Sequence, residues 1–285
     1  MSTPMSTPRA QRGTALIVAL LVLAIAAAAA AAMIENQDLQ QRSLRSERDY
    51  EQARWMLRGG MHWARYILFE DARSGSADHR RELWASGLPP TDVQLGSLAG
   101  EIGDQQALFN LNNVLRGGKI SPPHVAALGR LLAALGRRSE LADAIAAAME
   151  AGHPLADIAQ LTGMRAMDPD TLARLQRYAT ALPRPTPVNV NTAPPEVLVA
   201  VVEGLTLPEA QALARRLAAE PVRRREEFQA RLREGLSFNA EDVSVGSQFF
   251  MVHGHARVGG ADLRMQALLQ RMGTGLPAIV WQRAS

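Results

Sequence analysis

An uncharged apolar stretch at residues 14–34 constrains this chain more than any other feature of its sequence. About 20 helical residues, each rising ~1.5 Å, span a hydrocarbon core of ~30 Å. Arg9 and Arg12 precede the stretch, and Glu35 and Asp38 are the first charges after it. The positive-inside bias therefore predicts a cytoplasmic N-terminus, with the rest of the chain across the membrane. A cleaved secretory signal is the alternative, because Ala-x-Ala sites occur near residue 30.

The residues that flank this stretch resemble a known processing signal. A basic residue, Gly13 and then an apolar helix are similar to the prepilin-peptidase signal of type IV pilins and type II secretion pseudopilins. The resemblance implies cleavage after Gly13, so that Thr14 becomes the first mature residue and the helix is kept. Most members carry glutamate at the fifth mature position, where it pairs with a neighbouring subunit's N-terminus. This chain has Val18 there, and valine cannot make that pairing.

Composition excludes some kinds of site and leaves others open. The chain has no cysteine, which excludes disulfides and thiolate metal sites. Only 5% of its residues are aromatic, which is poor material for stacking on nucleic-acid bases. The net charge of +3 suits anionic lipid as well as nucleic acid, so it does not choose between them.

A helical pattern continues beyond the apolar stretch. Residues 35–49 are strongly polar, and apolar residues then return at helical spacing at Tyr50, Ala53, Leu57, Met61, Ala64 and Leu68. No proline interrupts residues 9–88. We therefore predict one long helix that ends near residues 74–76. Its outer part packs on a globular domain, and the Gly59-Gly60 pair favours a sheet as the partner over a coiled-coil stalk.

Two regions with strand-like patterns flank a helical block. Residues 93–115 predict a hairpin or two strands, and 249–258, 263–272 and 278–282 predict three more. Helices are expected from Pro122-Pro123 and over 139–150. The segments 154–163 and 195–204 have equal spacing, which predicts a repeated helix, glycine turn and helix at an offset of 41 residues.

These patterns predict an α+β fold, in which a long N-terminal transmembrane helix packs on a small antiparallel sheet that carries a large inserted all-α domain. The expected division is a leader, a transmembrane segment, the continuing helix, the first part of the sheet domain, the inserted domain and the C-terminal strands. Their ranges are 1–13, 14–34, 35–74, 75–120, 121–240 and 241–285.

Several segments in order along the chain resemble one family. Gly13-Thr-Ala-Leu-Ile-Val, Phe109-Asn-Leu-Asn, Pro154-Leu-Ala-Asp-Ile, Leu161-Thr-Gly-Met and Pro187-Val-Asn-Val-Asn-Thr-Ala-Pro-Pro-Glu-Val-Leu are similar to general secretion pathway protein K, the large minor pseudopilin of type II secretion. The missing glutamate at mature position five is itself a mark of that family.

The resemblance implies a place and a set of partners. The protein would span the bacterial inner membrane once, with a cytoplasmic N-terminus and a periplasmic C-terminal domain. It would sit at the tip of the pseudopilus with the minor pseudopilins I and J, take part in its initiation, and so serve protein export across the outer membrane. Other pseudopilins, prepilin peptidase and inner-membrane lipid are implied contacts, as are the secretin and the exported proteins.

Catalytic, metal and cofactor sites are not predicted. Family members often bind calcium at an acidic stretch before the Pro-Leu-Ala segment, whereas Glu150 alone cannot supply six to eight oxygen ligands here. His253 and His255 face one side of a strand, where solvent-facing histidines are commoner than metal ligands. The chain lacks a nucleophile elbow, a phosphate loop and a His-Glu-x-x-His motif. Asn189, Asn191 and Thr192 are interpreted as turn and N-cap residues.

A membrane-anchored DNA-binding protein is the alternative function. Asn-Val-Asn-Thr-Ala followed by helix, glycine turn and helix also resembles a helix-hairpin-helix module, which offers backbone N–H groups to phosphate. The nearby basic cluster consists of Arg215, Arg216, Arg223, Arg224 and Arg225. Because the turn at Gly204 has one glycine where such modules have two, and such clusters are usually solvated helix faces, DNA is the less favoured partner.

Overall fold

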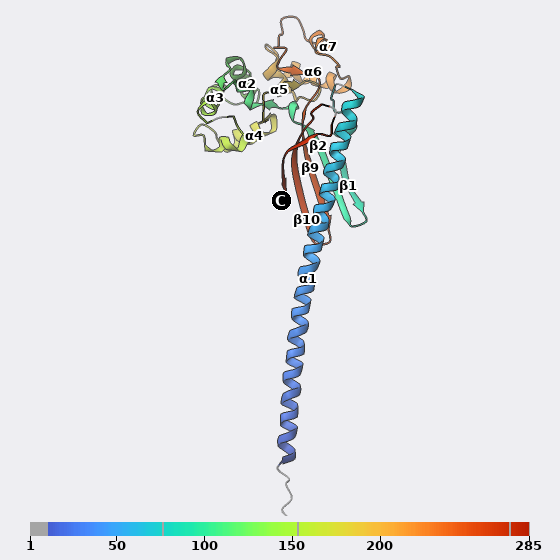
Figure 1. Ribbon diagram of the computed structural model, residues 1–285. Helices are drawn as coiled ribbons and strands as arrows, with labels where there is room; N and C mark the ends of the chain where they lie inside the picture. Colours follow the sequence, from blue (N-terminus) through green and yellow to red (C-terminus); the bar gives the residue numbers. More distant parts are fainter. Residues whose placement is uncertain (1–10, 76, 153, 274, 285) are drawn as a thin grey trace, which may run out of the picture.

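A single long helix dominates the molecule. Figure 1 shows the computed structural model, which describes residues 11–75, 77–152, 154–273 and 275–284. Helix α1 (Gln11–Ser74) contains 64 residues without interruption. A rise of ~1.5 Å per residue makes it ~95 Å long. Because no proline removes a helical hydrogen bond, the predicted continuous helix forms, and it ends where the sequence predicted.

The upper part of α1 lies against a five-stranded antiparallel sheet (Figure 1). The strand order is β1-β2-β9-β10-β11. The strands are β1 (Leu88–Val93), β2 (Gly96–Asp104), β9 (Phe249–Val258), β10 (Ala261–Gln270) and β11 (Ala278–Ala284). Strands β2 and β9 are direct neighbours although the whole helical part of the chain lies between them in sequence. The predicted α+β fold with an inserted helical part is therefore confirmed.

The apolar stripe of α1 forms the core between helix and sheet. Side chains from Ala53 to Leu68 along the stripe are at most 3% exposed, and they pack on the faces of β9 and β10. Tyr50 was expected to join this stripe, and that expectation is wrong because its side chain is 47% exposed. The neighbouring residue Asp49 contacts the β9–β10 turn, so the sheet ends at this level of α1.

Two glycines let the β9–β10 turn approach α1 at this point. The backbone N–H of Gly260 donates to Asp49 Oδ2 at 3.2 Å. Gly259 has φ +52°, and a Cβ atom at this residue would lie 2.1 Å from the Asp49 carboxylate. The turn therefore requires glycine at 259 for its backbone conformation and for the space beside the helix.

The first hairpin lies earlier in the chain than predicted. Strands β1 and β2 cover 88–104, whereas the pattern pointed to 93–115. Residues 105–116 instead form 3-10 turns and two-residue strands. Pro89 and Pro90 lie in β1, which is an edge strand, where proline is tolerated because one side of the backbone has no neighbouring strand to donate a hydrogen bond to.

The helical lobe comprises residues 109–244. Its helices are α2 (Pro122–Ala134), α3 (Leu141–Gly152), α4 (Pro169–Tyr178), α5 (Pro195–Val201), α6 (Leu207–Ala219) and α7 (Arg225–Ala230). Its short strands are β3 (Phe109–Asn110), β4 (Leu115–Arg116), β5 (Lys119–Ile120), β6 (Ala179–Thr180), β7 (Val188–Asn189) and β8 (Val243–Ser244). The 3-10 helices are η3 (Leu111–Val114) and η4 (Ile158–Gly163), while η1 (Leu83–Ser86) and η2 (Gln105–Ala107) belong to the sheet side. One hydrophobic core runs through this lobe, separate from the core under α1.

The lobe contains two copies of one structural unit. Each copy begins with an Asn-x-Asn segment, and the second asparagine forms two hydrogen bonds with the backbone of the residue after a distant proline. Asn112 bonds Leu155 in this way, with both distances 2.8 Å. Asn191 bonds Val222 in the second copy, with both distances 2.9 Å. Each copy then closes with a two-stranded parallel pair, β3 with β6 and β7 with β8.

This duplication differs from the predicted repeat. The offset of 41 residues equated Gly163 with Gly204, but Gly163 ends the 3-10 helix η4, whereas Gly204 has φ +80° between two α-helices. The glycine that corresponds to Gly204 is Gly136, with φ +70° between α2 and α3. The equal spacing of proline and glycine had therefore paired Gly163, near the end of the first structural unit, with Gly204, in the middle of the second.

Candidate functional site

The first half of α1 projects beyond the rest of the molecule. The segment Ala15–Ile34 is long and apolar enough to cross a membrane, and none of it is buried within the chain (Figure 1). Its leucines and isoleucines are 57–67% exposed on every side of the helix. So large a continuous apolar surface marks contact with lipid or with another protein. This helix is therefore the candidate membrane anchor of the chain.

The sequence-predicted processing residues fall at the start of α1. Gly13 and Thr14 lie in the first turn of the helix, where the structure describes the backbone only. Val18 lies one turn further on and its side chain is 58% exposed. A carboxylate at this position would lie near one end of the apolar span, where an unpaired charge costs less than at the middle of the bilayer.

Beyond the membrane, α1 carries an aromatic face that sequence reasoning missed. Trp55, Trp63 and Tyr66 are 64%, 47% and 55% exposed, on the side of the helix away from the buried stripe. The Arg58 guanidinium lies 4.7 Å from the centre of the Trp55 ring. Gly59 lies in the same stretch, and a Cβ atom there would meet nothing within 4 Å. Two tryptophans eight residues apart and off the apolar stripe were a signal of this surface.

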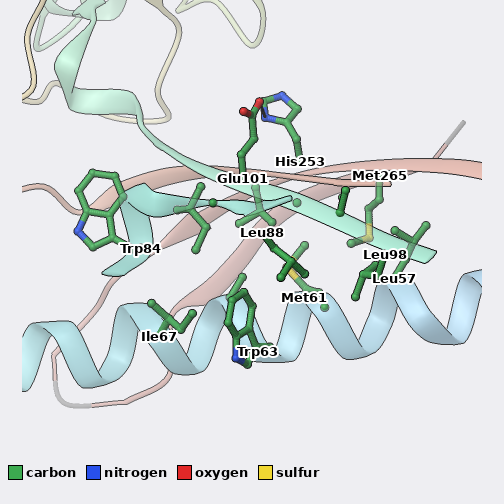
Figure 2. Close-up of a pocket in the computed structure, with 18 of the residues that line it drawn as sticks. Leu57, Met61, Trp63, Ile67, Trp84, Leu88, Leu98, Glu101, His253 and Met265 are labelled. Carbon is green, nitrogen blue, oxygen red and sulfur yellow. Dashed lines mark ion pairs between the residues drawn. The ribbon is translucent and has the colours of Figure 1, made fainter. Parts of the chain in front are cut away.

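An apolar pocket adjoins this face. It opens between α1 and the β1–β2 hairpin. Figure 2 shows Met61 between the helix and the strand residues Leu88 and Leu98, with the Trp63 ring beside the helix. Leu83, which is 71% exposed, also lines it. The pocket and the exposed tryptophans form one surface that could receive apolar side chains of a partner.

The asparagines predicted to cap a helix have a different role. Asn189, Asn191 and Thr192 are at most 4% exposed, and the N-cap of α5 is Pro194, which makes no side-chain cap bond. The turn part of the prediction holds, because the Asn191 N–H donates to Asn189 Oδ1 at 3.1 Å. The structure adds long-range bonds that no local pattern encodes.

These bonds converge on a buried carboxylate at the end of β2. Asp104 accepts hydrogen bonds from the Asn189 amide at 3.0 Å, the Thr192 hydroxyl at 2.6 Å and the Ser247 hydroxyl at 2.7 Å. Burial raises the pKa of Asp104, while the hydrogen bonds from Thr192 and Ser247 act against that rise. The result is a polar joint that fixes the helical lobe to the sheet.

A Ser-His-Asp set in the helical lobe lacks the arrangement of a hydrolase. Ser121 Oγ lies 2.7 Å from His124 Nδ1, and His124 Nε2 lies 2.8 Å from Asp242. In serine hydrolases the two ring nitrogens have the opposite partners. Pro122 and Pro123 directly follow the serine, so two N–H groups that could stabilise an oxyanion are missing. These contacts join the start of α2 to Asp242, the residue before β8.

The histidines on β9 are engaged by carboxylates. Figure 2 shows Glu101 and His253 together on the side of the sheet away from α1, with His253 Nδ1 3.4 Å from Glu101. His255 Nε2 lies 2.6 Å from Asp262. Among the described residues, one group of three carboxylates also lies close together, Asp71 with Asp78 and Glu82. An arginine side chain already lies between two of them, so the group is an ion-pair network.

In the candidate phosphate-binding hairpin at Gly204, a backbone N–H group is already hydrogen-bonded within the chain. The Thr206 N–H, just after the Gly204 turn, donates to Glu209 at 2.9 Å as part of a helix cap. In the basic cluster, Arg224 pairs with Glu227 at 3.2 Å and Arg225 donates to the carbonyl of Ala240. These groups serve the lobe's own structure, which weakens the DNA-binding alternative.

Comparison with known proteins gives consistent results. Residues 188–246 match the family model of type II secretion system protein K. A type II secretion system protein K of Pseudomonas aeruginosa is 29% identical over 92% of this chain and 90% of its own length. Another, from Klebsiella pneumoniae, is 30% identical over 73% of this chain and 76% of its own.

A solved structure shares the fold. A chain in the crystal structure of the GspK–GspI–GspJ complex from the enterotoxigenic Escherichia coli type 2 secretion system superimposes with a TM-score of 0.63. The two chains are 23% identical, and the match covers 85% of this chain and 98% of that one. The match therefore shows a shared fold over most of both chains.

An exposed apolar helix that continues onto an interrupted antiparallel sheet defines a membrane-anchored subunit of the pseudopilin class. The sequence relatives cover 73–92% of this chain and bear one common name. The chain belongs to the type II secretion system protein K family and is a minor pseudopilin.

Proposed function

We propose that this chain stands at the tip of a type II secretion pseudopilus, where it takes part in starting the filament and so in protein export across the outer membrane. Residues 1–13 lie on the cytoplasmic side, residues 14–34 cross the inner membrane once, and the remainder is periplasmic. Its role is structural, without a catalytic step. The single observation that carries this proposal is the uncharged, fully exposed half of α1, which is continuous with a folded lobe.

The lobes have separate tasks in this proposal. Residues 35–74 join the anchor to the sheet domain, for which the sequence predicted 75–120 and 241–285. The inserted helical lobe, predicted at 121–240 and formed by residues 109–244, gives the subunit a bulk that suits an end position better than a place inside a shaft. Val18 supports the same end position, because a subunit without a carboxylate there cannot pair with the N-terminus of a neighbour above it.

The partners are proposed to be the minor pseudopilins I and J, since the structural neighbour is a complex of K, I and J. We assign their contact to the face formed by Trp55, Trp63 and Tyr66 and to the apolar pocket beside it. This face continues the anchor helix, so a partner with its own membrane helix could lie alongside both. Gly59 leaves room for a helix backbone to approach closely.

Processing is tested by the mass of the mature N-terminus. We expect a chain that starts at Thr14 when prepilin peptidase is co-expressed, and the full chain when it is not. The Gly13→Val variant should stay uncleaved, and Thr14→Ser serves as the control that should still be cleaved. A mature chain that starts near residue 33 would show a removed secretory signal and would overturn the proposal.

Tip assembly is tested by co-purification with the I and J subunits. The Trp55→Ala, Trp63→Ala double variant should bind them at least ~30-fold more weakly, because a single buried tryptophan at an interface is worth about 2 kcal/mol or more and such values do not simply add. Trp281→Ala, on β11 at the other side of the sheet, is the matched control and should bind normally. Retention on duplex DNA at low salt in place of subunit binding would favour the alternative function.

A further inference from the structure

A knot of charged side chains lies where the end of α1 meets the rest of the molecule. Arg271, directly after β10, donates to Asp71 near the end of α1 and to Asp78 in the loop that follows, both at 2.8 Å. Its guanidinium lies 4.7 Å from the centre of the Phe250 ring. The three charged side chains are 5–12% exposed. Water therefore screens their charges only weakly.

The knot holds more negative than positive charge. Glu82 adds a third carboxylate, and oxygen atoms of Asp71, Asp78 and Glu82 lie within 4.8 Å of one another. Arg271 is the buried cation among them. His79 Nε2 lies 3.8 Å from Glu82, on a side chain that is 28% exposed. Three carboxylates around one buried guanidinium are unfavourable at low dielectric unless one of them takes a proton.

The remaining charged groups nearby do not balance this excess. On α1 itself, Glu70 and Arg73 pair with each other at 3.3 Å and face solvent. Arg80 and Arg81 donate to backbone carbonyls of Thr192 and Ala219. From β9 the neighbour is the apolar ring of Phe250. The carboxyl group of Asp104, which shares Ser247 with Asp78 as a hydrogen-bond donor, supplies no positive charge.

Asp78 connects this knot directly to the joint between the lobes. Its carbonyl accepts from the Asn189 amide at 3.0 Å, and its N–H donates to the Val245 carbonyl at 2.8 Å. Its carboxylate accepts from the Ser247 N–H at 2.6 Å. Because Asn189 and Ser247 also bond Asp104, a continuous polar chain leads from the end of α1 to the helical lobe.

One carboxyl group of this knot has a pKa in the physiological range. Burial raises the pKa of Asp71 to about 7, and the charges of Glu82 and Asp78 add to the rise, against the effect of Arg271. The value for an unstructured chain is 3.8. The folded protein therefore keeps a proton that the unfolded chain has already released. The stability that this proton provides is complete below pH ~4 and is lost as the pH rises through 7.

We propose that the knot formed by Asp71, Asp78, Glu82 and Arg271 is a proton-operated latch between the two lobes. With one proton bound, it holds the helical lobe at one angle on the sheet. When the proton leaves, the added negative charge weakens the bonds of Asp78 and frees the lobe to move. The orientation of the helical lobe at the end of the anchor would thus respond to the pH outside the cytoplasm.

The test measures the distance between the lobes in the full chain in detergent micelles with EDTA present. Since the chain has no cysteine, spin labels can be placed by Asp92→Cys on β1 and Gln211→Cys on α6, both exposed. We expect a narrow distance distribution at pH 5.5 and a broader one at pH 8.5. The Asp71→Asn variant, which keeps an acceptor for Arg271, should stay narrow at both. Glu70→Gln, one residue earlier, is the matched control and should behave like the unmodified chain.

Three results would overturn the latch. They are an unchanged distribution in the unmodified chain, a broadening in Asp71→Asn equal to that of the unmodified chain, and a narrowing at pH 8.5 on addition of millimolar calcium, which would assign the role to a cation. If Asp71→Asn fails to fold, the carboxyl carbon of Asp71 can be titrated by NMR in the unmodified chain. A midpoint near 7 supports the latch, and a midpoint near 4 sinks it.

Discussion

The two halves of α1 are the same helix with opposite relations to the protein. In the first half, Leu20, Leu21 and Leu23 are 57–66% exposed although they point in different directions. In the second half, Leu57 is 3% exposed while Trp55, two residues away, is 64% exposed. The first half thus has no inner side, whereas the second has an inner stripe and an outer aromatic face.

This difference shows what each half was selected to contact. A helix that is apolar on every side needs a solvent that is apolar on every side, and lipid is such a solvent. A helix with one apolar stripe needs one folded surface, which the sheet supplies. The aromatic residues on the outer face of the second half fit neither role, and they are the part of α1 left for other proteins.

The largest effect is expected when charged residues are introduced into the first half of α1. Leu23→Arg with Ile25→Arg places two cations near the middle of the span, at a cost of about 2.5–3.5 kcal/mol each. We expect the chain to be lost from membranes, as measured by flotation with lipid vesicles. Tyr66→Arg puts the same charge on the exposed face of the second half and should leave flotation unchanged. Equal loss in both would mean that the two halves do not differ in this way.

The inner and outer sides of the second half can be separated by stability. Leu57→Ala removes a buried side chain, so the free energy of unfolding should fall by about 2–5 kcal/mol. Trp55→Ala should lower it by no more than ~1 kcal/mol, since it loses chiefly an exposed contact with Arg58. Denaturant unfolding of the micelle-bound chain, followed by the buried Trp84 fluorescence, measures both. A larger loss in Trp55→Ala would show that the outer face packs within the chain.

The boundary between the halves is set at the β9–β10 turn. Gly259→Ala forces a side chain into φ +52° and against the Asp49 carboxylate, so it should destabilise the sheet by about 1–3 kcal/mol. Gly260→Ala meets nothing within 4 Å and is the control. Adding Asp49→Ala should recover part of the loss at Gly259, which a double-mutant cycle of unfolding free energies would detect. No recovery would mean that backbone strain alone requires the glycine.

The smallest expected physical change comes from Val18→Glu. Because this position lies near the end of the span, where a charged group costs less than at the bilayer centre, membrane retention should stay close to normal. Assembly should change instead, since the new carboxylate can pair with a neighbouring N-terminus. Crosslinking of the variant in a reconstituted pseudopilus should place it within the shaft as well as at the end. A strict end position would show that the helical lobe alone decides the placement.

The sequence by itself determined the parts that depend on local composition and period. The span of 14–34 follows from its lack of charge, the length of α1 from its lack of proline, and the buried stripe from apolar spacing at three and four residues. The C-terminal strands follow from alternation, and they form at 249–258, 261–270 and 278–284. The resemblance added the family, because motifs such as Pro187-Val-Asn-Val-Asn carry information that periodicity does not.

Only the tertiary structure decided where buried polar groups find partners. Asn189 and Asn191 carry a turn signal in sequence, yet their side chains bond Asp78, Asp104 and Val222, which are 31 to 111 residues away. The same holds for Arg271, whose two carboxylates lie about 200 residues earlier in the chain. A local pattern records which residues prefer a turn or a helix. It cannot record which distant group will satisfy a buried donor, because that depends on how the two lobes close on each other.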